Sequence, residues 1–326
     1  MTVLDSPQAA SPGGTVPPPG DAPENAAPEA SKGAAPPRPS GVYQMIWASV
    51  LILSVALLSF ALYVGLISSL HHARAQHTAY ANFRKALAEG TAPVSQVQPK
   101  ADPSDTTKLL KLGTAVALLS IPKIHLKEVV FEGTTPSVLQ NGPGHYRSTP
   151  LPGQAGISEI TGRAATYGGP FGQLSQLRAG DTITVTTGQG DSRYRVLDVR
   201  HAGDPVPPPF KPGGGRLLLA TASGAPFIPS GVVRVDADLI SPTQQTPTLV
   251  LSAADLSPSE HAMGTDPAAW LPLVLWGQAL VLAAILLSWA RSRWGQWQTW
   301  IVAVPVLLFF GLAVADAAAR LLPNLM

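Results

Sequence analysis

The chain of 326 residues contains no cysteine. It therefore has no disulfide, no thiolate ligand for a metal and no thiol nucleophile. Charged residues are also few, at 13% of the chain, and the formal net charge is only +2. This composition excludes a nucleic-acid partner, because binding phosphates needs a basic surface stripe. The histidines show no metal-ligand spacing, so we predict neither a metal site nor a cofactor.

Large apolar side chains are almost absent from the first forty residues, which are mainly Ala, Pro, Gly and Ser and include ten prolines. Such a segment cannot bury enough apolar surface to offset the entropy lost on folding. We therefore predict a disordered tail over residues 1–42.

Long apolar runs occur three times, at residues 43–70, 269–290 and 299–320. Each is long enough to cross a hydrocarbon core, which takes roughly 20 residues. A cleaved signal peptide is the alternative for the first run, because Ala73-Arg74-Ala75 resembles a cleavage site. The run is longer than a signal-peptide core and begins late, which favours an anchor. We predict three transmembrane helices in contact with lipid.

The flanks of these runs indicate an orientation. All seven tryptophans lie at or near the ends of the runs, where an amphipathic ring suits the membrane interface. Arg291 and Arg293 in the short loop between the second and third runs argue that this loop is cytoplasmic. The tail is then cytoplasmic and residues 71–268 lie outside the membrane, although Arg84 and Lys85 after the first run oppose this assignment.

Two residues interrupt the third apolar run. A carboxylate inside lipid is costly and often marks a functional site. Asp316, however, lies close to the outer end of the run and is followed by Arg320. We interpret Asp316 as reaching the membrane interface and Pro305 as a bend in the helix.

The region between the spans changes pattern along the chain. Residues 71–112 are predicted to form a helical stalk and a linker, and residues 242–268 form a second linker. Between them, at 113–241, short runs of Val, Ile, Leu and Thr are separated by Gly, Pro and Asp turns. These runs predict seven or eight strands, hence a mainly β barrel or sandwich. Short helices are expected at about 136–139 and 171–177.

One stretch of this region resembles a known family. It reads NGPGHYRSTPLPGQAGISEITGRAATYGGPFGQLSQLRAGDTITVTT. His145-Tyr146, Pro150–Gln154, Thr166–Gly168 and Leu177–Asp181 recur in it at the spacing typical of sortases, in particular the class E and class D type of actinobacteria. The resemblance implies an eight-stranded sortase-like barrel with short helices over residues 113–241, placed outside the cell at the cell wall or cell surface.

Sortases are transpeptidases that use a cysteine thiolate, a histidine and an arginine, and this sequence departs from the family at all three positions. By the resemblance, Ala222 stands at the nucleophile, Arg163 at the histidine and Val232 at the arginine. An acyl-enzyme cannot form without a nucleophile. Ser223 and Arg234 are the candidate substitutes. Ser223 is expected to point to the opposite strand face from Ala222, whereas Arg234 faces the same side as Val232.

A barrel that is retained without its chemistry favours binding over catalysis. The candidate binding residues are mostly aromatic: His145, Tyr167, Phe171, Phe210 and Phe227. A satisfied structural role is the alternative for His145. We predict a membrane-anchored, extracytoplasmic and catalytically inactive scaffold that binds peptide tails of surface proteins or a membrane partner. The alternatives are an active transpeptidase with atypical residues and an accessory subunit of a membrane assembly.

Overall fold

The computed structural model describes residues 41–98, 108–225, 228–294 and 296–326. Most of the predicted tail over residues 1–42 lies outside the described residues, and so does Phe227. The chain divides into two units, Met1–Gln44 and Met45–Met326. Only the first turn of a helix is described in the first unit, so the account below concerns the second.

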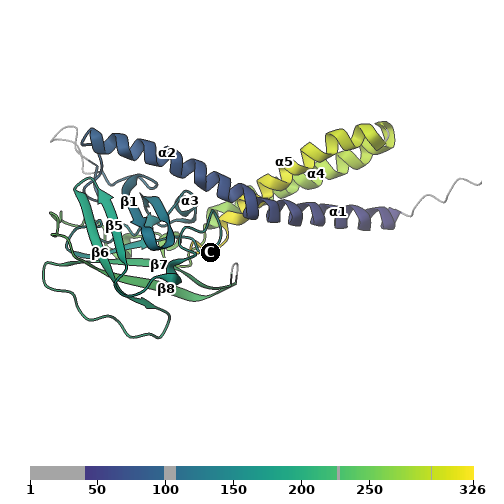
Figure 1. Cartoon of the computed structure of the whole chain (residues 1–326). Helices are drawn as coiled ribbons and strands as arrows, with labels where there is room; N and C mark the ends of the chain where they lie inside the picture. The colour runs from purple at the N-terminus through teal and green to yellow at the C-terminus, as the bar shows by residue number, and fades with distance from the viewer. Residues whose placement is uncertain (1–40, 99–107, 226–227, 295) are drawn as a thin grey trace, which may run out of the picture. The chain divides into compact units, whose positions relative to one another are not determined.

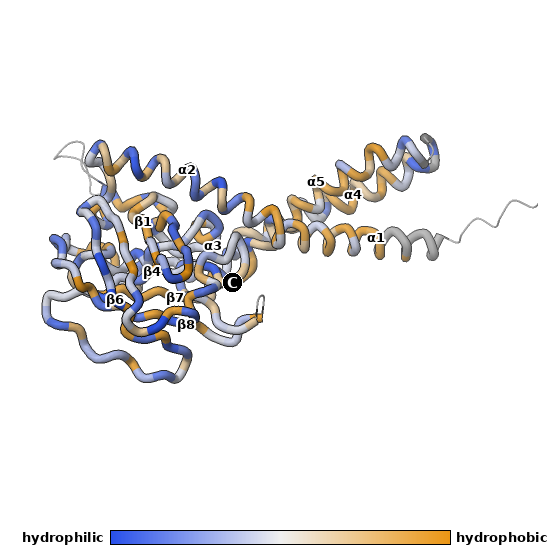
Figure 2. Tube along the Cα trace, viewed as in Figure 1, coloured by the Kyte–Doolittle hydropathy of each residue, from blue (hydrophilic) through white to orange (hydrophobic). Residues whose placement is uncertain are grey.

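Three of the described helices are long and apolar enough to cross a membrane, and they lie within Ser49–Ala88, Pro267–Arg291 and Trp297–Arg320. Figure 2 shows apolar residues along most of α4 and α5 and along the described part of α1. The three apolar helices predicted from the sequence are thus confirmed.

The first of these helices continues well beyond the predicted span. Helix α1 (Gly41–Leu62) passes through a π-helical turn, η1 (Tyr63–Ile67), into α2 (Ser68–Ala88). Helix α2 packs on the barrel, where Ala79 joins Val129 in an apolar cluster. The Gln76 side chain also donates to the carbonyl of Val129 and accepts from its amide, at 3.0 and 2.7 Å. The two remaining long helices are α4 (Trp270–Trp294) and α5 (Gln296–Arg320).

The region between α2 and α4 forms a closed eight-stranded barrel with the strand order β1-β2-β3-β4-β7-β8-β6-β5 (Figure 1). The strands are β1 (Ala115–Ile121), β2 (Leu126–Glu132), β3 (Gly144–His145), β4 (Gly156–Thr161), β5 (Thr182–Thr187), β6 (Gly190–Arg200), β7 (Gly215–Ala225) and β8 (Ile228–Leu239). The predicted fold class, a mainly β protein with an eight-stranded barrel, is confirmed.

Every second side chain along a strand points into the barrel, and these side chains fill its interior. Ile183 and Val185 of β5, Leu219 of β7 and Val235 of β8 are fully buried in one core cluster. Because side chains of a strand alternate between its two faces, their neighbours point outward. The expected helix at Pro136–Leu139 is confirmed as α3, and Thr135 caps it by accepting from the amide of Val138.

Candidate functional site

The three positions singled out by the sequence meet at one end of the barrel. Strands β4 and β7 run parallel, and β4 ends with Thr161 opposite Ala220 while β7 continues to Ala225. Gly162 follows β4 and donates to the carbonyl of Ala220 at 3.0 Å, and Thr221 donates back to the carbonyl of Gly162 at 2.9 Å. This pairing brings the next residue, Arg163, beside the part of β7 that carries Ala222.

Strand β8 completes this arrangement from the other side of β7. Ala222 lies opposite Val232, and Ala220 lies opposite Arg234. Directly opposed residues of an antiparallel pair point to the same face, so these four side chains share the outer face of the barrel. Arg234 therefore faces the same side as Val232, as the sequence predicts.

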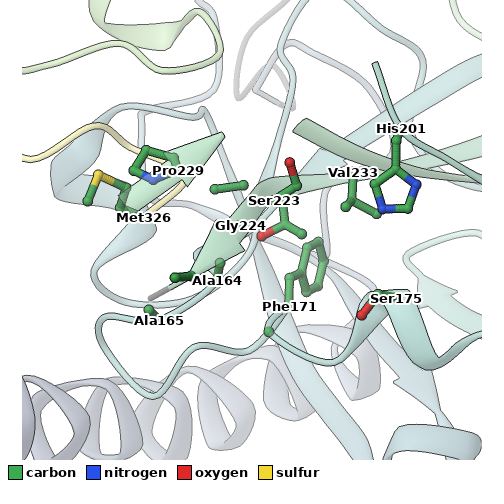
Figure 3. A pocket seen from close by; sticks show the side chains of 14 residues that line it. Ala164, Ala165, Phe171, Ser175, His201, Ser223, Gly224, Pro229, Val233 and Met326 are labelled. Atoms are coloured by element: carbon green, nitrogen blue, oxygen red, sulfur yellow. The ribbon is translucent and has the colours of Figure 1, made fainter. Parts of the chain in front are cut away.

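A pocket of about 310 Å³ opens beside Ala222, and we call it the Ala222 pocket. The residues that matter for its chemistry are Phe171, His201, Thr221, Ala222, Ser223 and Met326. Figure 3 shows Ser223 in the middle of the view, with Met326 on one side and His201 on the other. The pocket thus joins strand β7, the loop after β4, the loop after β6 and the segment after α5.

Ser223 lines the same pocket as Ala222, and it lies opposite Gly231, so strand alternation places its side chain on the other face from Ala222. The pocket lies at the end of the strand, where the register between β7 and β8 shifts between Ser223 and Gly224. Gly224 adopts φ +113°, and a Cβ there would lie 2.7 Å from the carbonyl oxygen of Ile228. Strand alternation does not extend through such an irregularity.

His201 is a pocket residue that the sequence analysis did not find. Its Nδ1 lies 3.8 Å from the carboxylate of Asp204, and both side chains are about half exposed. Within the described part of the chain, no hydrogen bond joins His201 to Ser223. His201 follows β6 in a Pro-rich loop with no periodic pattern, so only the fold brings it near β7.

Arg163, which the resemblance places at the family's histidine position, is fully buried. Its Nη1 donates to Thr166 Oγ1 at 3.0 Å and to the carbonyl of Met326 at 3.4 Å, and its Nη2 donates to the carbonyl of Pro136 at 3.1 Å. The guanidinium also lies over the Tyr167 ring, 4.9 Å from its centroid. Burial lowers the pKa of Arg163 to about 10, so the group stays charged at neutral pH and cannot accept a proton as a general base.

The segment Leu321–Met326, which follows α5, forms one wall of this site. Leu325 is fully buried, and its carbonyl accepts from the amide of Ala164 at 2.9 Å. Met326 lines the Ala222 pocket. The sequence analysis ended the third span near residue 320 and did not anticipate this contact, because the short stretch carries no motif.

Comparisons with known proteins find similarity to sortases over part of this chain. The family model of the sortase domain matches residues 119–256. Sortase D of Bacillus subtilis is 28% identical over 88 residues, which are 27% of this chain and 43% of that protein. The chain thus spans less than half the length of this curated relative. Residues 119–256 are a sortase domain.

Solved structures of sortases are also similar to this chain. Sortase E from Streptomyces avermitilis is 30% identical, and the match covers 45% of this chain and all of that one with a TM-score of 0.35. A sortase D transpeptidase of Clostridium perfringens is 22% identical, and the match covers 52% of this chain and 99% of that one with a TM-score of 0.40.

The sortase domain has no cysteine anywhere, so the family's nucleophile is missing from it. At the three compared positions the structure presents the methyl group of Ala222, the buried cation of Arg163 and the aliphatic side chain of Val232. Within the residues that the structure describes, no three or more His, Asp or Glu side chains are grouped to hold a metal ion.

Two of the predicted binding residues do not face the pocket. His145 is fully buried, with Nδ1 3.0 Å from a carboxylate oxygen of Glu132 and Nε2 3.0 Å from the carbonyl oxygen of Pro150. Tyr167 is also buried, and the guanidinium of Arg163 stacks over its ring. Both side chains therefore have structural contacts inside the sortase domain.

The other three predicted binding residues are phenylalanines that lie in different parts of the chain: Phe171, Phe210 and Phe227. Phe171 is fully buried and lines the Ala222 pocket, and its binding role stays a prediction. Phe210 lies in the loop between β6 and β7, where the guanidinium of Arg216 stacks 5.5 Å from its ring centroid. Phe227 lies outside the described residues, so its binding role stays a prediction.

Glu159 lies on β4, close enough to Arg234 of β8 for the charge of Arg234 to act on its carboxyl. It lies opposite Leu218 in the parallel pair of β4 and β7. Burial is the main influence on its carboxyl and raises the pKa of Glu159, while the nearby charge of Arg234 opposes this. A raised pKa in the folded state favours folding at low pH, and this contribution is lost as the pH rises through the folded pKa. Ionised Glu159 therefore costs the fold stability at neutral pH.

We expect Glu159→Gln to raise the free energy of unfolding at neutral pH, because the amide removes the cost of burying a charge. The gain should shrink as the pH falls from about 8 to about 4, where the native carboxyl becomes neutral. Chemical unfolding of the full chain across this range measures the difference. Glu89→Gln, at a half-exposed site, is the control. A difference that grows on acidification would contradict the assignment.

Proposed function

We propose that this chain is a membrane-anchored, extracytoplasmic, sortase-like protein that binds a peptide without joining it to an acceptor. The single observation behind this proposal is the methyl group of Ala222 in the pocket where the family has its thiol. The partner we propose is an extended tail of a cell-surface protein or of another membrane protein, held in the Ala222 pocket.

The loss of catalysis follows from what acyl transfer needs. A transpeptidase must attack a carbonyl carbon, hold the acyl group covalently and pass it to an amine, so it needs a nucleophile and a base. In a well-studied serine protease, removing the nucleophile lowers turnover by roughly a millionfold. Here Ala222 supplies no nucleophile, and Arg163 stays protonated at neutral pH although burial lowers its pKa to about 10.

The retained pocket supports binding. Its volume of about 310 Å³ lies at the lower end of the range for small-ligand sites. Apolar contact is offered by Phe171, Val233 and Pro229, and polar contact by the hydroxyl groups of Ser175 and Ser223. Apolar walls with a few polar groups are typical of sites that hold a short peptide.

The apolar helices support an anchor. Three described helices have the length and composition to cross a membrane. Arg291 and Arg293, in the last turn of α4, favour a cytoplasmic position for the connection between α4 and α5, which would leave the sortase domain on the outer side. An accessory role in a membrane assembly would appear as a stoichiometric integral-membrane partner on purification from native membranes.

A second candidate function is favoured by one observation. Ser223 and His201 line the same pocket, and Asp204 lies next to His201. A hydroxyl, an imidazole and a carboxylate are the three groups of a serine hydrolase site. This function requires Ser223 to become hydrogen-bonded to His201 when substrate binds.

A transfer assay separates the two functions. The purified full chain is incubated with a fluorescent sorting-signal peptide and an amine acceptor, with an active sortase as the positive control. We expect binding of the peptide but no cleavage or transfer product above background. Product that disappears in Ser223→Ala and persists in Ser175→Ala, the matched change at another pocket serine, would overturn the proposed function in favour of the second one.

A further inference from the structure

The segment Leu321–Met326 is held far more tightly than a chain segment that merely follows a helix. Such segments usually fray unless specific contacts hold them. Asn324, Leu325 and Met326 are instead 1%, 0% and 7% exposed. Their burial therefore needs an explanation in terms of contacts with the sortase domain.

The side-chain amide of Asn324 donates hydrogen bonds to main-chain carbonyls. Its Nδ2 donates to the carbonyls of Thr134 and His261, both at 2.9 Å. The main-chain amide of Asn324 donates to the carbonyl of Gly264, also at 2.9 Å. The two carbonyls belong to different loops of the domain. A side chain with two N–H donors satisfies both at once, which aspartate or leucine would not do.

The next two residues are recognised through their main chain. The amide of Ala164 donates to the carbonyl of Leu325 at 2.9 Å. Thr166 Oγ1 and Arg163 Nη1 donate to the carbonyl of Met326, at 2.5 and 3.4 Å. Donors that contact only carbonyl oxygens do not distinguish one peptide sequence from another, so the side-chain pockets decide which peptide binds.

Arg163 and Thr166 need a peptide in this site to accept their hydrogen bonds. Arg163 is fully buried, and the carbonyl of Met326 is one of its three hydrogen-bond acceptors. If the segment left, Arg163 and Thr166 would lose this acceptor, and an unsatisfied buried donor costs about 1–3 kcal/mol. A second peptide that offers the same carbonyls removes this cost, so exchange is favoured over an empty site.

We propose that Leu321–Met326 is an internal peptide ligand of the sortase domain, bound beside Ala222, and that a partner peptide of the same chemistry replaces it. The matching ligand is a segment that forms the same turn, in which the amide of Met326 donates to the carbonyl of Pro323 at 3.1 Å, and that carries a carboxamide side chain followed by two apolar residues. This inference rests on the proposed function in that the replacing ligand enters the same peptide-binding site.

The tether makes the internal segment a strong competitor. A segment joined by a short linker acts at an effective concentration in the millimolar range. Here the linker is short, because the segment directly follows Arg320 at the end of α5. External peptide therefore binds the intact chain weakly and binds a chain with a displaced segment much better.

The first test displaces the segment by one substitution. Leu325→Lys places a charge at a fully buried position and expels the segment, whereas Leu321→Lys makes the same change at a partly exposed position. The probe is a fluorescent, acetylated and amidated peptide of sequence LLPNLM, titrated into full chains in detergent. We expect Leu325→Lys to bind it about tenfold more tightly, or more, than the wild type and Leu321→Lys.

The probe with Asn replaced by Leu tests the carboxamide, and we expect its binding to Leu325→Lys to be at least about tenfold weaker. Equal binding of the LLPNLM probe by Leu325→Lys and the wild type would overturn the inference. If Leu325→Lys binds a sorting-signal peptide but not the LLPNLM probe, this inference fails and the proposed function stands. If it binds neither, both fail.

A second measurement does not depend on a variant that disturbs the core. Because the chain has no cysteine, Ala164→Cys with Met326→Cys introduces the only two thiols, and both positions line the same pocket. A short thiol cross-linker should join them in the full chain and block binding of the probe. Ala164→Cys with Val206→Cys, at a residue 81% exposed, is the control pair. Equal cross-linking of both pairs would overturn the inference.

Discussion

Replacing Glu132 by alanine is expected to lower the free energy of unfolding by about 3–5 kcal/mol, because it leaves a buried polar partner uncompensated. Glu132 and His145 are 1% and 0% exposed and lie opposite each other in the parallel pair of β2 and β3. Their side chains approach to 3.0 Å. The loss also frees the ring that holds the carbonyl of Pro150, at the loop leading to β4.

Chemical unfolding of the full chain in detergent measures this loss. Glu89→Ala, at a residue in a half-exposed ion pair with Lys85, is the matched control and should change the free energy by no more than about 0.5 kcal/mol. Glu132→Gln keeps an acceptor for His145 and should lie between the two. A Glu132→Ala loss no larger than that of Glu89→Ala would show that the buried pair contributes nothing.

Phe171→Ala is expected to lower the free energy of unfolding by about 3–5 kcal/mol and to enlarge the Ala222 pocket. Phe171 is fully buried in the barrel core and also lines the pocket. Its ring lies so close to Gly162 that a Cβ on that residue would approach it to 2.6 Å. Removing the ring therefore leaves a cavity between the core and the site.

Two controls accompany this substitution. Phe171→Leu keeps most of the volume and should lose less stability. Phe210→Ala removes a ring that stacks on Arg216 in a loop and should have a small effect. A Phe171→Ala loss below about 1 kcal/mol would show that the ring is not part of the packed core.

The barrel was predictable because strand alternation is a local signal. The run DTITVTT at residues 181–187 alternates polar and apolar side chains, and the structure buries its Ile183 and Val185. The apolar runs predicted the three long helices for the same reason, since length and composition suffice. The family resemblance located the ends of β4 and β7, and the parallel pairing of these strands brings Arg163 to Ala222.

The site itself was less predictable because its contacts join distant residues. The hydrogen bond from Thr166 to Met326 spans 160 positions, and no periodic pattern reports such a pair. His201 enters the pocket from an irregular loop. The register shift between Ser223 and Gly224, near the end of β7, is not visible in the alternation either.

The contacts of Asp316, in the third span, were also not predictable from the sequence. The sequence analysis interpreted it as a side chain reaching the interface. In the structure Asp316 accepts from the hydroxyl of Tyr63 in η1 and from Arg320 at 2.7 Å. The Tyr63 hydroxyl also lies 3.3 Å from that of Tyr167, which supports Arg163. A polar path thus links α5 to the site, and only the fold reveals it.

The central claim is that the Ala222 pocket holds a peptide without reacting with it. The most direct test is the intact mass of the full chain after incubation with a sorting-signal peptide, with and without an amine acceptor. The account predicts a mass identical to that of the untreated chain while the peptide binds reversibly. A gain in mass equal to the acyl portion of the peptide would contradict it.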